Sequence, residues 1–169
     1  MKTTIALFLV CASLLLNNKI NTTDSEIAFT FESEGVTGTI GDIQSQSEID
    51  VTQLEESIIK GSVSVSSLET GNFLRDGHLM WEKYFNRSDY ARIYFESTRI
   101  KENKDRSYNL EGNLTIKGIS KPVTFLVVKK DNTMNITGSI YTSDWNINIE
   151  KEKKKNKATI TMSLKIDES

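Results

Sequence analysis

The segment YNLEGNLTIKGISKPVTF, Tyr108–Phe125, decides the fold class. Apolar and polar residues alternate along both halves of this segment, and a period of two is typical of a strand with one buried face. The middle of the segment, 117–122, predicts a turn in which Gly118 adopts a positive φ and Pro122 opens the next strand. In the first half, one face would carry Leu110, Gly112, Leu114 and Ile116.

The same alternation recurs along the chain from Glu26 onward and predicts about eight strands at close spacing. Turn residues separate these strands, so consecutive strands would pair as antiparallel hairpins. An all-β sandwich or barrel is the expected fold class. The expected apolar faces are Ile27–Phe31, Val63–Val65, Ile93–Phe95, Leu110–Ile116, Val123–Val127, Ile136–Ile140, Ile147–Ile149 and Ile160–Ile166.

One stretch, Thr70–Arg87, breaks the alternation. Its apolar residues between Leu79 and Phe85 follow a helical spacing, which predicts a short helix near residues 78–86. Asp76 is suited to cap the start of that helix through its carboxylate. A weaker helical turn is expected at Val51–Glu56.

Length, charge and composition exclude several classes of protein. The 169 residues fit one domain, and a net charge of −2 provides no basic excess for binding a phosphate backbone. Nucleic acid is therefore not an expected partner. One histidine and one cysteine allow neither an intramolecular disulfide nor a zinc site, so we expect no metal and no tightly bound cofactor.

The first residues predict export. Lys2 precedes the apolar run Ile5–Leu16, which has the length of a signal-peptide core and is short for a transmembrane helix. We expect a signal peptide at about 1–20, a barrel domain at 25–169, and a periplasmic or secreted location. Cys11 offers a lipoprotein alternative, but the bulky Val10 before it disfavours that processing.

Catalytic residues are few. His78 is the only histidine and the candidate general base, and Asp76 or Glu82 could assist it in an enzyme acting on a lipid. No Gly-x-Ser-x-Gly sequence or similar turn presents a serine nucleophile. A histidine that hydrogen-bonds within its own loop, beside a structural Arg75–Asp76 pair, is the simpler interpretation. We therefore expect a protein that is not an enzyme.

The inward residues favour binding of an apolar ligand. A small barrel is either filled by its own side chains or holds one small molecule. Here the inward residues are Ile, Val, Leu and Phe, while Gly112 and Gly138 would leave room beside the backbone. Alternation alone does not separate a hollow interior from a packed one. A filled barrel that serves as a scaffold or interaction module, which the resemblance described next would place in the bacterial envelope, is therefore the alternative hypothesis.

Two longer motifs resemble the YceI-like family. The segment Ser67–Leu79, SLETGNFLRDGHL, is followed by Tyr84–Phe85 and then by the strand sequence Ala91–Ser97. The segment Tyr108–Val123 resembles the family's Gly-x-Leu-Thr-Ile-Lys-Gly stretch. Thr142–Trp145 resembles the family's later Asn-Arg-Ser-Asp-Phe-Gly element, but this chain has neither the Arg nor the Gly.

This resemblance spans Ile27–Ile166 and implies a lipocalin-like barrel of eight antiparallel strands with a helix near the Arg-Asp-x-His-Leu motif. It also implies a bacterial exported protein that binds an isoprenoid chain or a quinone tail without catalysis. A ligand protruding from one mouth of the barrel would favour a homodimer. Trp81 and Lys83 depart from the small or polar residues common at their positions, which puts the chain length of the ligand in doubt.

The candidate ligand-binding residues are those expected along the barrel wall and near its mouth. The expected wall residues are Phe29, Phe31, Val63, Val65, Phe73, Leu74, Leu79, Phe85, Phe95, Leu114, Phe125 and Trp145. Arg75, Asp76 and His78 are the polar candidates for contact with a head group at the mouth.

Overall fold

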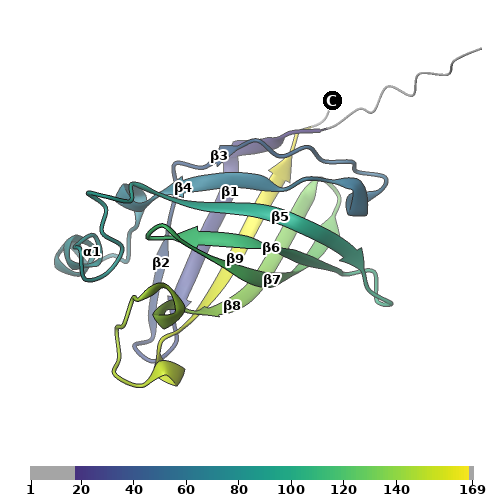
Figure 1. The fold of residues 1–169 in the computed structure, drawn as a ribbon. Helices are drawn as coiled ribbons and strands as arrows, with labels where there is room; N and C mark the ends of the chain where they lie inside the picture. The colour runs from purple at the N-terminus through teal and green to yellow at the C-terminus, as the bar shows by residue number, and fades with distance from the viewer. Residues whose placement is uncertain (1–17, 168–169) are drawn as a thin grey trace, which may run out of the picture.

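The computed structural model describes residues 18–167. Cys11 and nearly all of the expected signal peptide therefore lie outside the described residues. One antiparallel sheet of nine strands, in the order β2-β1-β9-β8-β7-β6-β5-β4-β3, curls into a half-barrel (Figure 1). The predicted all-β antiparallel fold is confirmed, and it is lipocalin-like. The strands are β1 Ile20–Phe31, β2 Val36–Thr39, β3 Gln44–Ser45, β4 Lys60–Ser64, β5 Arg92–Glu102, β6 Tyr108–Ile116, β7 Ile119–Lys130, β8 Thr133–Tyr141 and β9 Lys157–Ile166.

The β6–β7 hairpin forms as expected, with a tighter turn. Ile116 pairs with Ile119, so Lys117 and Gly118 form a two-residue loop in which φ is 50° and 70°. Two positive φ values characterise the type I′ turn, whose twist matches that of the flanking strands. Pro122 lies inside β7 rather than opening it. Its missing N–H is tolerated because β7 pairs with β8 only from Leu126 onward.

The two edge strands of the sheet approach each other and nearly close the barrel. Asn18 exchanges backbone hydrogen bonds with Ile49 at one end, and Thr39 does so with Glu69 at the other. These are isolated bridges rather than a continuous ladder. The barrel wall is therefore complete on one side and is joined by separate contacts along the seam between β1–β2 and β3–β4.

The strand count differs from the expected eight in two places. β2 and β3 are short edge strands that the alternation did not indicate, while the expected strand at Ile147–Ile149 is absent. The chain leaves the sheet after Tyr141 and enters the 3-10 turn Thr142–Trp145, which ends at Asn146 in a left-handed conformation with φ of 57°. The first strand begins at Ile20, earlier than the expected start of the barrel at residue 25.

The helix α1 spans Phe73–Leu79, so it contains the Arg-Asp-x-His-Leu motif as the resemblance implies, whereas the position near residues 78–86 predicted from apolar spacing is wrong. Asn72, and not Asp76, is the N-cap, and its side-chain oxygen accepts hydrogen bonds from the N–H groups of Leu74 and Arg75, both at 3.1 Å. The segment after Leu79 forms successive turns. The expected helical turn at Val51–Glu56 is present as a 3-10 turn at Leu54–Glu56.

Two apolar clusters fill the two ends of the half-barrel. The first includes Leu79, Phe85 and Trp145, beside α1 and the loop between β8 and β9. The second includes Leu54 and Ile100, where β5 ends and β6 begins. The space between the clusters is enclosed by the inward faces of the strands.

Candidate ligand-binding site

A cavity of about 170 Å³ lies inside the half-barrel between the two apolar clusters. Every strand except β2 contributes to its lining, and nearly all of the lining surface is apolar. A cavity of about 150 Å³ is large enough to hold a molecule of benzene. The interior is thus hollow at the scale of one small hydrocarbon group.

Seven of the expected wall residues line this cavity. Several inward residues, among them Phe29 and Phe95, are only half-buried although they face the interior. The cavity itself accounts for this partial exposure. The expected residues found in the lining are Phe29, Phe31, Val63, Phe85, Phe95, Leu114 and Phe125.

Three further expected residues are buried but do not line the cavity. Val65, Leu79 and Trp145 belong to the cluster beside α1, and they close that end of the barrel. The Trp145 Nε1–H donates to the carbonyl oxygen of Leu114 at 3.3 Å. This bond ties the β8–β9 loop to β6.

Phe73 and Leu74 lie outside the barrel. Both belong to α1, where they are 87% and 69% exposed, and neither faces the cavity. The reason is that the helix begins at Phe73. Its capped first turn directs both side chains toward solvent, and Leu79 is the helical residue that packs inward.

The expected polar mouth residues make contacts within the α1 region. Thr70 connects two of them: its hydroxyl donates to the Asp76 carboxylate and accepts from Arg75 Nε at 2.7 Å. Arg75 Nη2 also donates to the Thr70 carbonyl oxygen at 2.9 Å. His78 is exposed and packs against Trp81 with ring centroids 4.3 Å apart. None of the three lines the cavity.

The glycines do not leave room for a ligand in the way the sequence suggested. A Cβ atom on Gly112 would lie 2.4 Å from Phe95 Cζ, and one on Gly138 would lie 2.4 Å from Phe125 Cδ1. Each missing side chain is therefore replaced by a phenyl ring that lies against the backbone. Phe95 and Phe125 also contact each other edge to face, with centroids 5.8 Å apart. The glycines thus hold the rings against the wall of the cavity.

Sequence reasoning missed part of the lining. Ile27, Ile93, Ile136, Ile160 and Met162 were expected to face inward but were not named as binding residues, and all of them line the cavity. The alternation that placed them inside was the available signal. Ile43 and the polar residues Gln44, Ser45 and Lys60 also contribute, and no pattern in the sequence marked them.

The lining offers little chemistry beyond apolar contact. Among the described residues that line the cavity, the ionisable ones are Lys60 and Tyr94. Lys60 Nζ binds Glu96 Oε1 at 3.1 Å, and Tyr94 is 53% exposed. Within residues 18–167 no group of His, Cys, Asp and Glu side chains is arranged to hold a metal ion. In the same part of the chain, no helix has the length and apolarity to span a membrane.

Comparison with known proteins agrees with this geometry. Two curated relatives are UPF0312 proteins. The one from Yersinia pestis is 39% identical over 62 residues, 37% of this chain and 32% of the relative. The one from Photorhabdus laumondii is 33% identical over 86 residues, 51% of this chain and 44% of the relative. The matches thus span less than half the length of these relatives.

Solved structures share the fold at low identity. BcnA of Burkholderia cenocepacia superposes with a TM-score of 0.76 at 19% identity, covering 88% of this chain and 99% of BcnA. A polyisoprenoid binding domain from Saccharophagus degradans, implicated in plant cell wall breakdown, has a TM-score of 0.63 at 12% identity, covering 90% of this chain and 99% of that domain. The model of the YceI-like domain matches residues 19–167. The chain therefore belongs to the YceI-like family.

Proposed function

We propose that this protein binds an isoprenoid or a similar apolar chain inside its half-barrel and carries it without covalent chemistry. The observation that supports the proposal is the apolar cavity of about 170 Å³ between the two apolar clusters. A hydrocarbon gains free energy in such a space, whereas a polar molecule would leave hydroxyl groups unpaired there. The polyisoprenoid binding domain with the same fold also favours this ligand class.

The size of the cavity sets a scale for binding. An isoprene unit contains five carbons, and burial contributes roughly 0.8 kcal/mol per methylene, so one unit contributes about 4 kcal/mol. By comparison with benzene, a cavity of about 170 Å³ holds approximately one such unit. A longer chain would extend past Phe29 and Phe95, the half-buried rings that line the cavity.

The protein is proposed to be a carrier and not an enzyme, because the lining residues include no carboxylate or imidazole. Export is part of the proposal and depends on the apolar run Ile5–Leu16. The alternative of a filled scaffold requires an interior without a cavity, and the observed cavity counts against it.

Lipid extraction from the purified protein, followed by mass spectrometry, tests this proposal. The matched variants are Ile160→Phe, at a residue that lines the cavity, and Thr161→Phe, at its outward-facing and exposed neighbour. We expect Ile160→Phe to lose the bound lipid and Thr161→Phe to retain it. An empty extract together with no uptake of added isoprenoid would contradict the proposal.

A further inference from the structure

Three large apolar side chains are strongly exposed within nine residues of sequence. Phe73, Leu74 and Trp81 are 87%, 69% and 59% exposed, more than any other large apolar residue in the described part of the chain. They lie on α1 and the turn that follows it, which project from one end of the half-barrel (Figure 1). Clustered exposure of this kind marks an interaction surface more often than isolated exposed residues do.

The segment that carries these side chains is held firmly. The Asn72 cap and the Thr70 contacts with Arg75 and Asp76 fix the first turn of α1, while buried Leu79 anchors its end. Phe73 and Leu74 therefore stay exposed in a defined arrangement, because a rigid helix prevents them from folding back onto the barrel.

The same end of the barrel carries an excess of positive charge. The loop between β8 and β9, together with its flanks at 142–157, contains five lysines and three carboxylates, a net charge of +2. The segment 73–92 has a net charge of +1. Glu32 and Glu34, in the turn between β1 and β2, lie beside this loop, because Phe31 pairs with Ala158. The positive charge is therefore local to the lysine-rich loop and would attract a negatively charged surface that approaches it.

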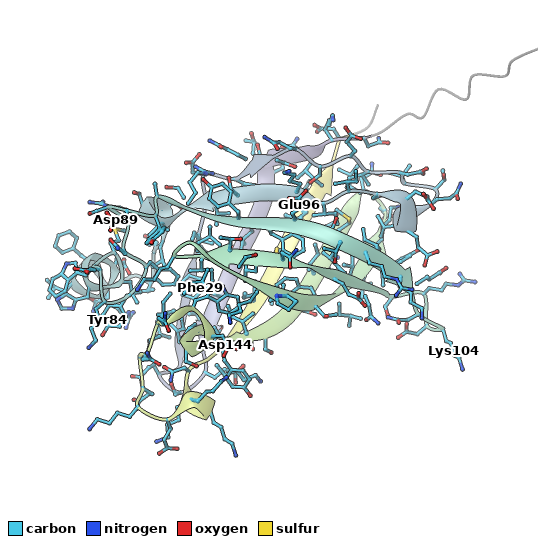
Figure 2. All side chains as sticks on the ribbon, viewed as in Figure 1. Phe29, Tyr84, Asp89, Glu96, Lys104 and Asp144 are labelled. Atoms are coloured by element: carbon cyan, nitrogen blue, oxygen red, sulfur yellow. The ribbon has the colours of Figure 1, made fainter. Side chains whose placement is uncertain are left out.

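Two of the five lysines in this loop have no ion-pair partner among the described residues. Lys153 pairs with Asp144 at 2.6 Å, Lys155 with Glu152 at 3.5 Å and Lys157 with Glu32 at 3.8 Å. In the segment 73–92, Arg92 pairs with Asp42 at 2.7 Å. Lys151 and Lys154 are exposed and have no ion-pair partner among residues 18–167. Figure 2 shows Asp144 in this loop and Tyr84 beside α1 at one end of the molecule, with Lys104 at the opposite end.

The turns after α1 and the loop between β8 and β9 both reach the cavity. Phe85, in the turns that follow α1, lines the cavity, and so does Thr142, the first residue of the β8–β9 loop. β7 and β8 pair only from Leu126 to the hairpin between them, so the start of β7 and the end of β8, on this side, are not hydrogen-bonded to each other. Trp145 and Ile147 of the loop belong to the cluster that fills this end.

We propose that the α1 end of the barrel docks on the surface of a lipid bilayer that contains anionic lipids. Phe73, Leu74 and Trp81 enter the interfacial region, where amphipathic aromatic rings are favoured. Lys151 and Lys154 meet the anionic head groups. Docking places the end that borders the cavity against the membrane.

Flotation with vesicles of phosphatidylcholine, alone or mixed with phosphatidylglycerol, tests the surface directly. We expect binding to the mixed vesicles that weakens as salt is added, since salt screens exposed charges. The chain has two tryptophans, and Trp145 is buried, so a blue shift on binding reports Trp81. Trp81→Phe should remove the shift.

Paired variants separate the two contributions. Phe73→Ser/Leu74→Ser should weaken binding to mixed vesicles by about tenfold or more, because each buried apolar side chain contributes substantially. Its control is Leu126→Ser/Val128→Ser, at exposed apolar residues of β7. Lys151→Gln/Lys154→Gln should weaken binding by about fivefold per lysine on mixed vesicles. Its control is Lys104→Gln/Lys130→Gln.

The absence of flotation with mixed vesicles, or equal losses in the test and control variants, would overturn the proposal. A dimer that Phe73→Ser/Leu74→Ser dissociates, without vesicle binding, would instead assign the surface to a second copy of the chain. These vesicles contain no isoprenoid. Their result is therefore independent of lipid extraction, and failure of the docking proposal is distinguishable from failure of the carrier proposal.

Discussion

The contact between Gly138 and Phe125 provides a test of how the cavity keeps its volume. In Gly138→Ala the new Cβ would lie 2.4 Å from Phe125 Cδ1, 3.1 Å from Cε1 and 3.3 Å from the Thr124 carbonyl oxygen. Ordinary contact begins at 3.4 Å, so the ring must retreat by about 1 Å. Phe125 lines the cavity, and the retreat is directed into that space.

The magnitude follows from this displacement. Extra volume in a tightly packed core costs about 1–3 kcal/mol. Here the cavity accepts the ring, so we expect the free energy of unfolding to fall by only about 1 kcal/mol. The displaced ring occupies cavity space that would hold roughly one methylene of the ligand, and burial of that methylene contributes about 0.8 kcal/mol to the binding free energy. Affinity for a short isoprenoid alcohol should therefore fall about fourfold.

Isothermal titration with that alcohol and urea denaturation measure the two effects. Gly77→Ala is the control, because a Cβ there meets nothing within 4 Å and alanine favours a helix. Combining Gly138→Ala with Phe125→Leu removes the clashing ring and should restore the affinity. Unchanged affinity and stability in Gly138→Ala, or no recovery in the double variant, would refute the idea that the glycine holds the ring against the wall.

Three other perturbations have defined outcomes. Asn156→Ala removes a buried side chain that accepts hydrogen bonds from the Ile149 and Glu150 N–H groups and donates to two backbone carbonyls. Because these bonds hold the lysine-rich loop in place, we expect trypsin to cleave the loop much faster in this variant. An unchanged cleavage rate would contradict that role of Asn156. Trp145→Ala should lower the free energy of unfolding by about 3–5 kcal/mol in urea denaturation; a loss below about 1 kcal/mol would show that Trp145 does not support the α1 end. The Thr52 hydroxyl, then the Thr52 and Gln53 N–H groups, lower the pKa of Asp50 below its ordinary value. Its stabilising effect is therefore complete above about pH 3.9 and is lost as pH falls through the lowered pKa, and an NMR titration that gives an ordinary pKa would contradict these bonds.

Local sequence predicted the parts of the fold that depend on local rules. The alternation in β6 and β7 and the positive φ of Gly118 required only neighbouring residues, so their hairpin was predictable. Periodicity misplaced α1, although the motif resemblance placed a helix at residues 75–79. The apolar spacing of Leu79–Phe85 suggested a helix, but the Asn72 cap starts it earlier, and residues after Leu79 pack as turns against the barrel end.

The inward residues of the candidate site were also predictable from local sequence, but their contacts across strands were not. Alternation identified Phe29, Phe95 and Phe125 as inward residues, and they line the cavity. It did not reveal that Phe95 lies over Gly112, because that contact crosses between strands. A motif resemblance placed Arg75 near a ligand, whereas the structure commits its guanidinium to Thr70.

The sequence by itself determined the sheet, the inward set of residues and the family, since each depends on periodicity or on contiguous motifs. Only the tertiary structure decided that the interior is hollow and that Phe73 and Leu74 face solvent. The physical reason is that a cavity is the volume left after side chains from distant strands have met. That remainder depends on rings such as Phe125 lying over glycines on other strands, and no local pattern records it.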